Sequence, residues 1–424
     1  MRPRTWVLLL AAVFALLQLA NVTGRDTPDT KNYLSYALSL SGAGKRGAAA
    51  GAIEHYCASR ASSAKRAQSV HVVHFHRADP TARHLAGCRE REWRRVETRL
   101  EAGQTGGHTV PFMPERFMRI FEVRPGYPAF LVPFVTVLGV TWGVWTASVL
   151  VAAAGGVLAF LILRTLSVPV PLALTGQALY YVLPCGATAM RPMTEGLLMA
   201  LTLTAVLGCA LVVRGRRERA GLALVAGSLA LLFTVKHSQA LFLGSSLAVA
   251  GAAIALRRRR RGRAPGRDVL RLAGIGLGAA LATVVLARLL HYPSESESLQ
   301  DLLADHFARP DRARPWPEFL QLQGNFWTEW TRRQLREPLF VTALAAGAWG
   351  ALRRPAFGAF LLAAAATGVL TQIGHPDIGI WGGRLIVLAW LLPVVGIPLL
   401  LEPVVRAPVA LPAQGHADRA RAIS

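Results

Sequence analysis

Ionisable side chains lie beside the apolar segments of this sequence at several places far apart along the chain. A charge in or near a hydrocarbon layer is costly, so such side chains are candidates for a functional site. Carboxylates there could accept a proton, and cationic side chains could hold an anionic group such as a phosphate. The candidates, with two tyrosines that could contact a ligand, are Asp26, Asp29, Tyr33, Arg124, Tyr127, Arg191, Glu195, Lys236, His237, Arg288, His291, His375, Asp377 and Arg384.

The composition indicates which solvent surrounds most of the chain. Of the 424 residues 53% are hydrophobic and 17% are charged, and the formal net charge is +23. The charges come in short bursts between long apolar stretches, which excludes a disordered chain and argues strongly against a soluble globular protein. A nucleic-acid-binding protein of this basicity would be rich in charge throughout, so we expect no nucleic-acid partner. A membrane protein remains.

Ten apolar runs are close to the roughly 20 residues that cross a bilayer. They cover residues 6–22, 142–163, 168–183, 194–213, 220–235, 239–256, 269–290, 338–352, 356–373 and 385–401. The first run follows Arg2 and Arg4, and we expect it to be a retained helix rather than a cleaved signal peptide. Residues 127–141 are shorter and contain two prolines, so we expect a re-entrant or interfacial helix there. The predicted fold is an all-α polytopic membrane protein with about ten transmembrane helices.

Arginine clusters predict the orientation, because short cytoplasmic loops are enriched in basic residues. The clusters at 214–219, 257–267 and 353–354 are two crossings apart, so they lie on one side, with both termini in the cytoplasm. The five arginines at 257–261 could bind phosphate, but a topology anchor that contacts anionic lipid is favoured. The predicted units are a first transmembrane helix (1–23), an extracytoplasmic loop domain (24–126), a helix bundle (127–290), a second outer loop (291–337), C-terminal helices (338–401) and a cytoplasmic tail (402–424).

The large first loop has local patterns of its own. Apolar residues at helical spacing predict helices at 29–40 and 88–100, and β-favouring residues suggest a short strand at 69–75. Cys57 and Cys88 could pair in an oxidising exterior, and the sequence leaves this open. His71, His74 and His76 stand close together, but no matching ligand spacing follows, so a solvated strand is favoured over a zinc site.

The topology places the ionisable candidates from different helices on the outer face. A transport path would more naturally place such groups near the midplane of paired repeats. Ionisable side chains gathered on one face instead indicate a site that opens to the exterior and acts on a molecule anchored in the bilayer.

Three short motifs then carry a resemblance to a known family. Asp29 begins D-x-x-x-Y-L-x-x-A-x-x-L, Arg124 begins R-P-G-Y-P, and Arg384 precedes a late helix with Leu392-Pro393. Glu195 follows Thr194 at the start of another helix. In this order the motifs resemble those of the GT-C superfamily of polytopic glycosyltransferases, which includes protein mannosyltransferases and aminoarabinose transferases. We expect the large C-terminal soluble domain found in part of that family to be missing, as in its smaller bacterial members.

The resemblance implies a function and roles for the residues. It implies transfer of a sugar, with inversion, from a polyprenyl-phosphate donor to a cell-envelope acceptor on the outer face of the cell membrane. Asp29, with Asp26 nearby, would be the catalytic carboxylate. Arg384, Lys236 or Arg191 would stabilise the leaving phosphate, and Tyr33 and Tyr127 would line the cleft. No cofactor is implied with certainty, and a divalent metal is left open.

Two other functions compete with this interpretation. A multi-pass transporter or lipid flippase would need a midplane site and internal repeats, and no clear repeat is present. A non-catalytic scaffold would bind a cell-wall polymer through the first loop. That loop carries 17 Lys and Arg against 10 Asp and Glu between Gly24 and Arg124. Such an excess suits an anionic donor or acceptor.

Overall fold

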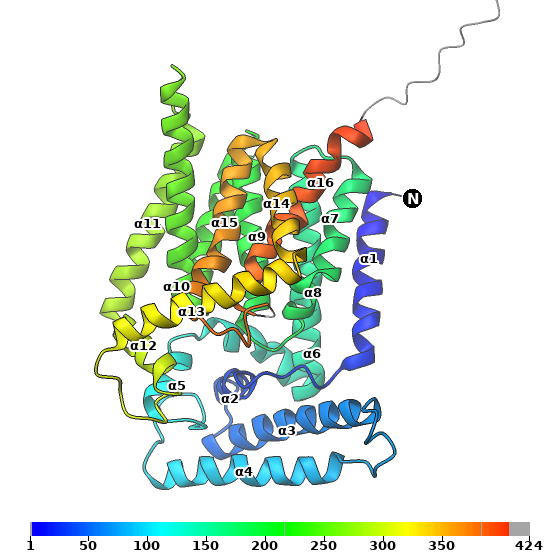
Figure 1. Cartoon of the computed structure of the whole chain (residues 1–424), viewed down its shortest axis with the longest axis vertical. Helices are drawn as coiled ribbons and strands as arrows, with labels where there is room; N and C mark the ends of the chain where they lie inside the picture. The colour runs from blue at the N-terminus through cyan, green and yellow to red at the C-terminus, as the bar shows by residue number, and fades with distance from the viewer. Residues whose placement is uncertain (1, 216, 383, 407–424) are drawn as a thin grey trace, which may run out of the picture.

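The computed structural model describes residues 2–215, 217–382 and 384–406, and this part of the chain is helical without a strand. Long helices stand side by side in a bundle, and a layer of shorter helices covers one end of it (Figure 1). The bundle contains α1 (Pro3–Gln18), α6 (Gly126–Thr165), α7 (Val170–Val182), α8 (Pro184–Ala189), α9 (Thr194–Val213), α10 (Glu218–Arg260), α11 (Arg267–Leu289), α14 (Leu339–Leu352), α15 (Pro355–Gly374), the 3-10 turn η2 (Leu385–Trp390) and α16 (Leu391–Arg406).

Seven helical segments are long and apolar enough to cross a membrane, as in a polytopic membrane protein. They are Pro3–Asn21, Gly126–Thr165, Thr194–Val213, Glu218–Arg260, Arg267–Leu289, Pro355–Gly374 and Leu385–Arg406. The sequence predicted ten crossings. The difference arises because α7 and α14 have only 13 and 14 residues, and because the two runs at 220–235 and 239–256 fall within the single 43-residue element α10.

A straight helix as long as α10 would extend about 65 Å, roughly twice the hydrocarbon thickness of a bilayer. The backbone leaves the helical region at Lys236 (φ −163°, ψ 96°). Glu218 and Arg258, near the two ends of α10, pair with Arg271 and Asp268 at the start of α11. His237 instead contacts Tyr292, beyond the end of α11. The direction of α10 therefore reverses at Lys236, and its halves form a helical hairpin.

Helix α6 also bends, at Gly139, whose φ of 71° and ψ of 172° favour glycine. A Cβ on Gly143 would meet the carbonyl oxygen of Phe134 at 2.5 Å, although nine residues of a straight helix would separate them widely. The arm at 126–138 is thus folded against the start of the segment at 140–165. The re-entrant or interfacial placement predicted for 127–141 stays a prediction.

The covering layer contains α2 (Thr30–Leu40), α3 (Lys45–Ser69), α4 (Thr81–Glu101) and α5 (Glu115–Glu122), reached from α1 through the short 3-10 turn η1 (Leu19–Asn21). Helices α3 and α4 lie across the end of the bundle, and α2 lies between them and the bundle (Figure 1). A disulfide joins Cys57 of α3 to Cys88 of α4, with 5.6 Å between their Cα atoms. Two further helices, α12 (Glu295–Leu303) and α13 (Pro315–Arg336), belong to the second predicted loop.

The helices expected at 29–40 and 88–100 are confirmed by α2 and α4, but the strand expected at 69–75 is wrong. Residues there form consecutive turns, in which the amides of His74 and Phe75 donate to the carbonyl of His71. The described residues offer no second strand with which this segment could pair, and β propensity without a partner does not make a strand.

The basic clusters gather at the bundle end opposite the covering layer. Arg214 and Arg406 both donate to Ser167, and Arg354 and Arg406 both pair with Glu402. The N-terminus of α1 and the end of α16 are at this end as well (Figure 1). The predicted tail begins at 402 within α16, and residues 407–424 of it lie outside the described residues.

Candidate functional site

Asp29 stands where the chain enters α2, at the junction of the covering layer and the bundle. Its carbonyl oxygen accepts from the amides of Asn32 and Tyr33, which closes the first turn of the helix. The hydroxyl of Thr30 donates to the carbonyl of Pro192, 3.1 Å away. That bond fixes the start of α2 against the segment before α9. The backbone thus holds the Asp29 side chain over the end of the bundle.

Arg384 joins two carboxylates from distant parts of the chain. Its Nη2 contacts Oδ2 of Asp29, and its Nε donates to Oε1 of Glu195, 3.1 Å away. Burial alone lowers the pKa of an arginine, but the two carboxylates outweigh burial and raise the pKa of Arg384 above its ordinary value. Arg384 therefore stays charged and holds the Asp29 carboxylate in place.

The break in α10 brings a second cation to this cluster. Lys236 is partly buried and lines a small cavity together with Glu195. Two carboxylates and two cations are thus gathered, and their formal charges cancel. The neighbouring His237 has its ring centroid 5.0 Å from that of Tyr292, in an edge-to-face arrangement. The sequence analysis had named all of these residues except Tyr292 as candidates.

Aromatic rings support α2 from the side of the bundle. The Tyr33 ring lies edge-on to Phe121 and Tyr127, with centroid distances of 5.1 and 5.4 Å. Arg124 donates to the Tyr33 phenol oxygen over 3.4 Å, and burial raises the pKa of Tyr33. Both tyrosines are buried. They pack α2 against α6 here, whereas the resemblance implied that they line a cleft.

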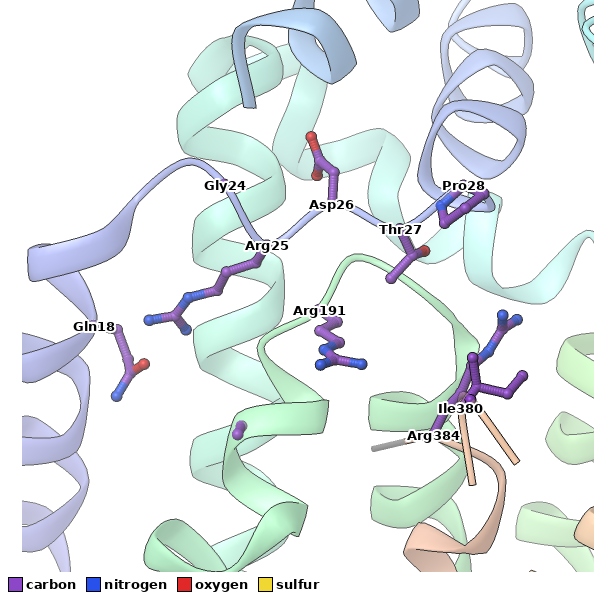
Figure 2. Close-up of a pocket in the computed structure, with 11 residues that line it drawn as sticks. Gln18, Gly24, Arg25, Asp26, Thr27, Pro28, Arg191, Ile380 and Arg384 are labelled. Atoms are coloured by element: carbon purple, nitrogen blue, oxygen red, sulfur yellow. The ribbon is translucent and has the colours of Figure 1, made fainter. Parts of the chain in front are cut away.

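A cavity of about 620 Å³ opens next to this cluster (Figure 2). It lies between the end of α1, the connection to α2, the segment around α8 and the chain before η2. Arginine side chains enter it from three segments, with Arg191 between Arg25 and Arg384 in the view (Figure 2). The lining residues are Gln18, Gly24, Arg25, Asp26, Thr27, Pro28, Ala187, Arg191, Gly379, Ile380 and Arg384.

Asp26 borders this cavity, but its carboxylate points away from Arg191 and Arg384 (Figure 2). The side chain is 3% exposed, and its Oδ1 lies 3.4 Å from Nε2 of His55 on α3. Among the described residues, its Oδ2 has no hydrogen-bond partner. The two aspartates suggested as catalytic therefore occupy different surroundings: Asp29 pairs with an arginine, and Asp26 lies beside a histidine.

Sequence reasoning missed Arg25 and Gln18, which line the cavity. Arg25 stands next to Asp26 in the connection after the first helix, so its position was a usable signal. The disulfide of Cys57 and Cys88 lies within the α3–α4 layer, outside the set of cavity-lining residues. Within the described ranges, no group of three or more His, Cys, Asp or Glu side chains could hold a metal ion.

Comparison with known proteins does not assign this chain to a family. No family model, no curated protein and no solved structure matches the chain. What the arrangement can do follows from its chemistry. Arginines in a cavity at the edge of an apolar bundle can bind an anionic group, and an ion-paired carboxylate beside them can accept a proton.

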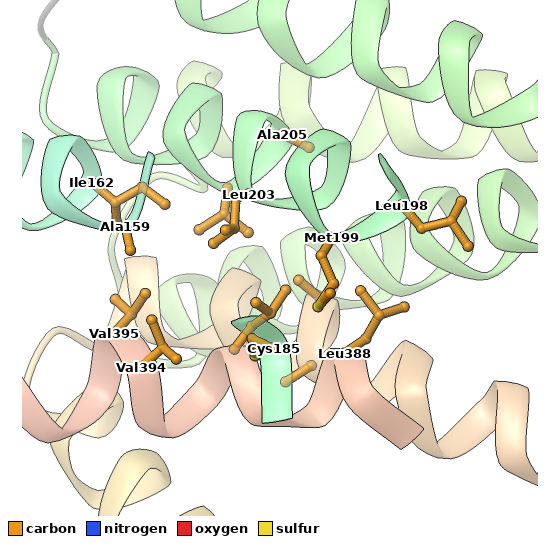
Figure 3. Close-up of a cluster of buried hydrophobic side chains, with 14 of the residues drawn as sticks. Ala159, Ile162, Cys185, Leu198, Met199, Leu203, Ala205, Leu388, Val394 and Val395 are labelled. Carbon is orange, nitrogen blue, oxygen red and sulfur yellow. The ribbon is translucent and has the colours of Figure 1, made fainter. Parts of the chain in front are cut away.

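The packing beneath the site is apolar and close. The core around α9 and α16 contains Leu198, Met199, Leu203, Leu388 and Val394, all buried (Figure 3). Where α14 crosses α16, a Cβ on Gly350 would collide with the backbone of Gly396, so glycine permits the close approach. Arg384, which directly precedes η2, is therefore positioned by a closely packed apolar core.

Proposed function

We propose that this protein is an integral-membrane glycosyltransferase. It moves a sugar from a polyprenyl-phosphate donor to an acceptor on the outer face of the membrane, as the resemblance to the GT-C superfamily implies. The observation that carries the proposal is the 620 Å³ cavity, which Arg25, Arg191 and Arg384 line beside the Asp29 carboxylate. The basic clusters at the opposite end support an extracytoplasmic location for this site and cytoplasmic termini.

The donor phosphate would be bound by the arginines that line the cavity, Arg25, Arg191 and Arg384. Arg384 also pairs with two carboxylates, which fix its position. Guanidinium groups match the several oxygens of a phosphate by paired hydrogen bonds. They would also stabilise the charge that develops on the phosphate as it leaves. Gln18, at the end of the lipid-facing helix α1, borders the same cavity, so the polyprenyl tail could extend along α1.

Asp29 would act as the general base. The acceptor hydroxyl gives its proton to Asp29, its oxygen bonds to the anomeric carbon, and the bond from that carbon to the phosphate oxygen breaks. The electron pair of the broken bond leaves with polyprenyl phosphate, and the anomeric configuration inverts. Arg384 holds Oδ2 of Asp29, so Oδ1 would receive the proton. Glu195 fixes Arg384 from the buried side and so has a positioning role.

The test uses the purified full-length protein in proteoliposomes, with no ion gradient and a radiolabelled polyprenyl-phosphate sugar. We expect release or transfer of the sugar by the unaltered chain. Removing a general base typically lowers the rate about 10²–10⁴-fold, and we expect this loss for Asp29→Asn. Asp79→Asn, a change at an exposed carboxylate of the same layer, is the matched control and should retain activity.

Full activity of Asp29→Asn would rule out Asp29 as the base. Movement of intact donor across the bilayer without cleavage of the sugar would instead favour a lipid flippase. Separating lipid-linked from released label measures the cleavage, and access of a membrane-impermeant reagent to the intact donor measures its movement between the leaflets.

A further inference from the structure

The connection between α3 and α4 exposes apolar side chains that no part of the site uses. Val70, Val72, Val73 and Phe75 are 80, 88, 61 and 63% exposed. The other long connection of the same layer, between α4 and α5, buries its large apolar residues Val110 and Phe112 completely. Exposure of several large apolar side chains within six residues marks an interaction surface. We call residues 70–76 the apolar tip.

The apolar tip is an ordered structure. The Gln68 side chain donates to the carbonyls of Arg77 and Ala78, both at 3.0 Å, and closes the base of the connection. Within it, the amide of Phe75 donates to the carbonyl of His71 at 2.9 Å, and the His71 and His74 rings stack at 4.3 Å. These bonds hold the connection together, while its apolar side chains remain exposed.

The position of the tip relates it to the membrane. The connection that follows α1 and η1 touches the last third of α3, where the Thr23 and Ser62 hydroxyls lie 3.3 Å apart and Ser63 donates to the carbonyl of Gly24. Helix α3 continues from there to Ser69, so the tip lies beyond the point at which α1 leaves the bundle. Figure 1 shows the turn between α3 and α4 next to the lower end of α1.

Helix α1 itself faces lipid. It meets the criteria of a membrane-crossing helix, and only 11% of its apolar window is buried in the protein. A bilayer around the bundle would therefore surround most of α1, including its end near the tip. The charges near the tip also fit a lipid surface: Arg66 and Arg77 flank it, and the nearby Asp79 is neutralised by Lys65 at 2.6 Å. Basic residues around an apolar segment suit anionic headgroups.

We propose that the apolar tip inserts into the lipid leaflet next to the end of α1. Val72 and Phe75 enter the boundary between headgroups and acyl chains, and the histidines stay at the headgroup level, where side chains with an apolar body and a polar edge are favoured. The layer of α3 and α4 is then supported at one end by lipid and at the other by the bundle. This inference does not depend on the proposed enzymatic function.

The experiment places a reporter at the tip of the otherwise complete protein. Val72→Cys is labelled with the environment-sensitive fluorophore NBD without reductant, because Cys57 and Cys88 are paired and Cys185 and Cys209 are buried. The unaltered chain gives the background labelling. Thr105→Cys, an exposed position in the connection between α4 and α5, is the matched control. Both are reconstituted in vesicles of phosphatidylcholine and phosphatidylglycerol, with and without lipid that carries a nitroxide on the upper acyl chain.

We expect blue-shifted emission at position 72 and quenching by the nitroxide lipid at least about twofold stronger than at position 105, as for a side chain at the acyl boundary. Equal, weak quenching at both positions would overturn the proposal, because the tip would then lie in water. Blue-shifted emission at position 72 without lipid quenching would also overturn it, since the tip would then contact protein, either another part of the chain or a second copy.

Discussion

Both ends of the bundle contain arginine ion pairs, and one pair from each end shows how far their exposure can differ. At the basic end, Arg271 pairs with Glu218 where both side chains are substantially exposed, 54 and 39%. At the site end, Arg384 is 25% exposed and its partner Glu195 only 5%. Water screens the first pair and contributes little to the second. The same residue type therefore forms a pair that water screens in one place and organises a cluster of buried charges in the other.

This difference has a physical consequence for stability. An exposed ion pair is typically worth about 0.2–1 kcal/mol, because solvent already stabilises both charges. Removing one member of a buried pair costs about 3–5 kcal/mol, because it leaves the other charge without compensation. Substitution of Arg384 should therefore lower the free energy of unfolding much more than substitution of Arg271.

The largest effect is expected for Arg384→Met. It leaves Glu195 buried beside Asp29 without their shared cation, and we expect a loss of about 3–5 kcal/mol in the free energy of unfolding. Thermal unfolding of the purified protein in nanodiscs measures it. The double variant Arg384→Met/Glu195→Gln should recover part of the loss, since the uncompensated charge is gone. If Arg384→Met alone is as stable as the unaltered chain, the proposed difference between the buried and the exposed ion pair is wrong.

The disulfide of the covering layer should have the next largest effect. Cys57→Ser/Cys88→Ser opens a link between residues 31 apart, and such links typically contribute about 2–4 kcal/mol. We expect faster hydrogen exchange in α3 and α4 and an unchanged rate in α9 and α16. Equal acceleration in the bundle helices would show that the layer and the bundle unfold as one unit.

A surface pair at the basic end should have a small effect. Arg271→Gln removes the ion pair with Glu218, and we expect a loss of about 0.2–1 kcal/mol. The loss should become smaller in high salt, because salt screens exposed charges. Thermal unfolding at low and high salt tests this expectation. If Arg271→Gln instead lowers the free energy of unfolding by several kcal/mol at every salt concentration, the pair of Arg271 and Glu218 behaves like a buried pair.

The smallest effect is expected for the pH dependence of residues 291–314, a segment that contains His306. His306 donates its Nδ1–H to Oδ1 of Asp301 over 3.1 Å, and this bond raises the pKa of His306 in the folded protein. A raised folded-state pKa stabilises the loop fully below the unfolded value, about 6.5. The stabilisation is lost as pH rises through the folded value.

Hydrogen exchange of residues 291–314, corrected for its intrinsic pH dependence, should therefore quicken as pH rises above about 6.5. Asp301→Asn removes the cause of the shift and should flatten this dependence. A dependence of equal size in the variant would assign it to another group. The basic end should show no comparable change in this range.

The sequence predicted local features of the fold well. The run at 194–213 coincides with α9, because twenty mostly apolar residues between polar segments define both limits of a helix. The helices α3 and α13 were not predicted. The first is rich in alanine and lacks a clear apolar stripe, and the second was treated as a loop because it follows a polar segment.

The candidate site was only partly predictable. The motifs named Asp29, Glu195 and Arg384, which the structure brings into contact across up to 355 residues of sequence. No local pattern indicates that Glu195 faces Arg384 from the buried side, because such a contact depends on how α9 packs against the chain before η2. For the same reason, the cavity and the role of Arg25 could be seen only in the folded chain.

The break of α10 at Lys236 has a consequence for how the chain is built. Glu195 is synthesised 41 residues before Lys236, about 2–8 s earlier at typical elongation rates, and Arg384 follows much later. A lone carboxylate at the end of α9 is disfavoured next to hydrocarbon. Insertion of α9 together with the hairpin of α10 is therefore favoured, because the hairpin brings Lys236 beside Glu195. Arg384 then joins the cluster last. Maturation of the site is thus coupled to the arrival of the final helix, and a chain that stops before it lacks the cation that Asp29 and Glu195 share.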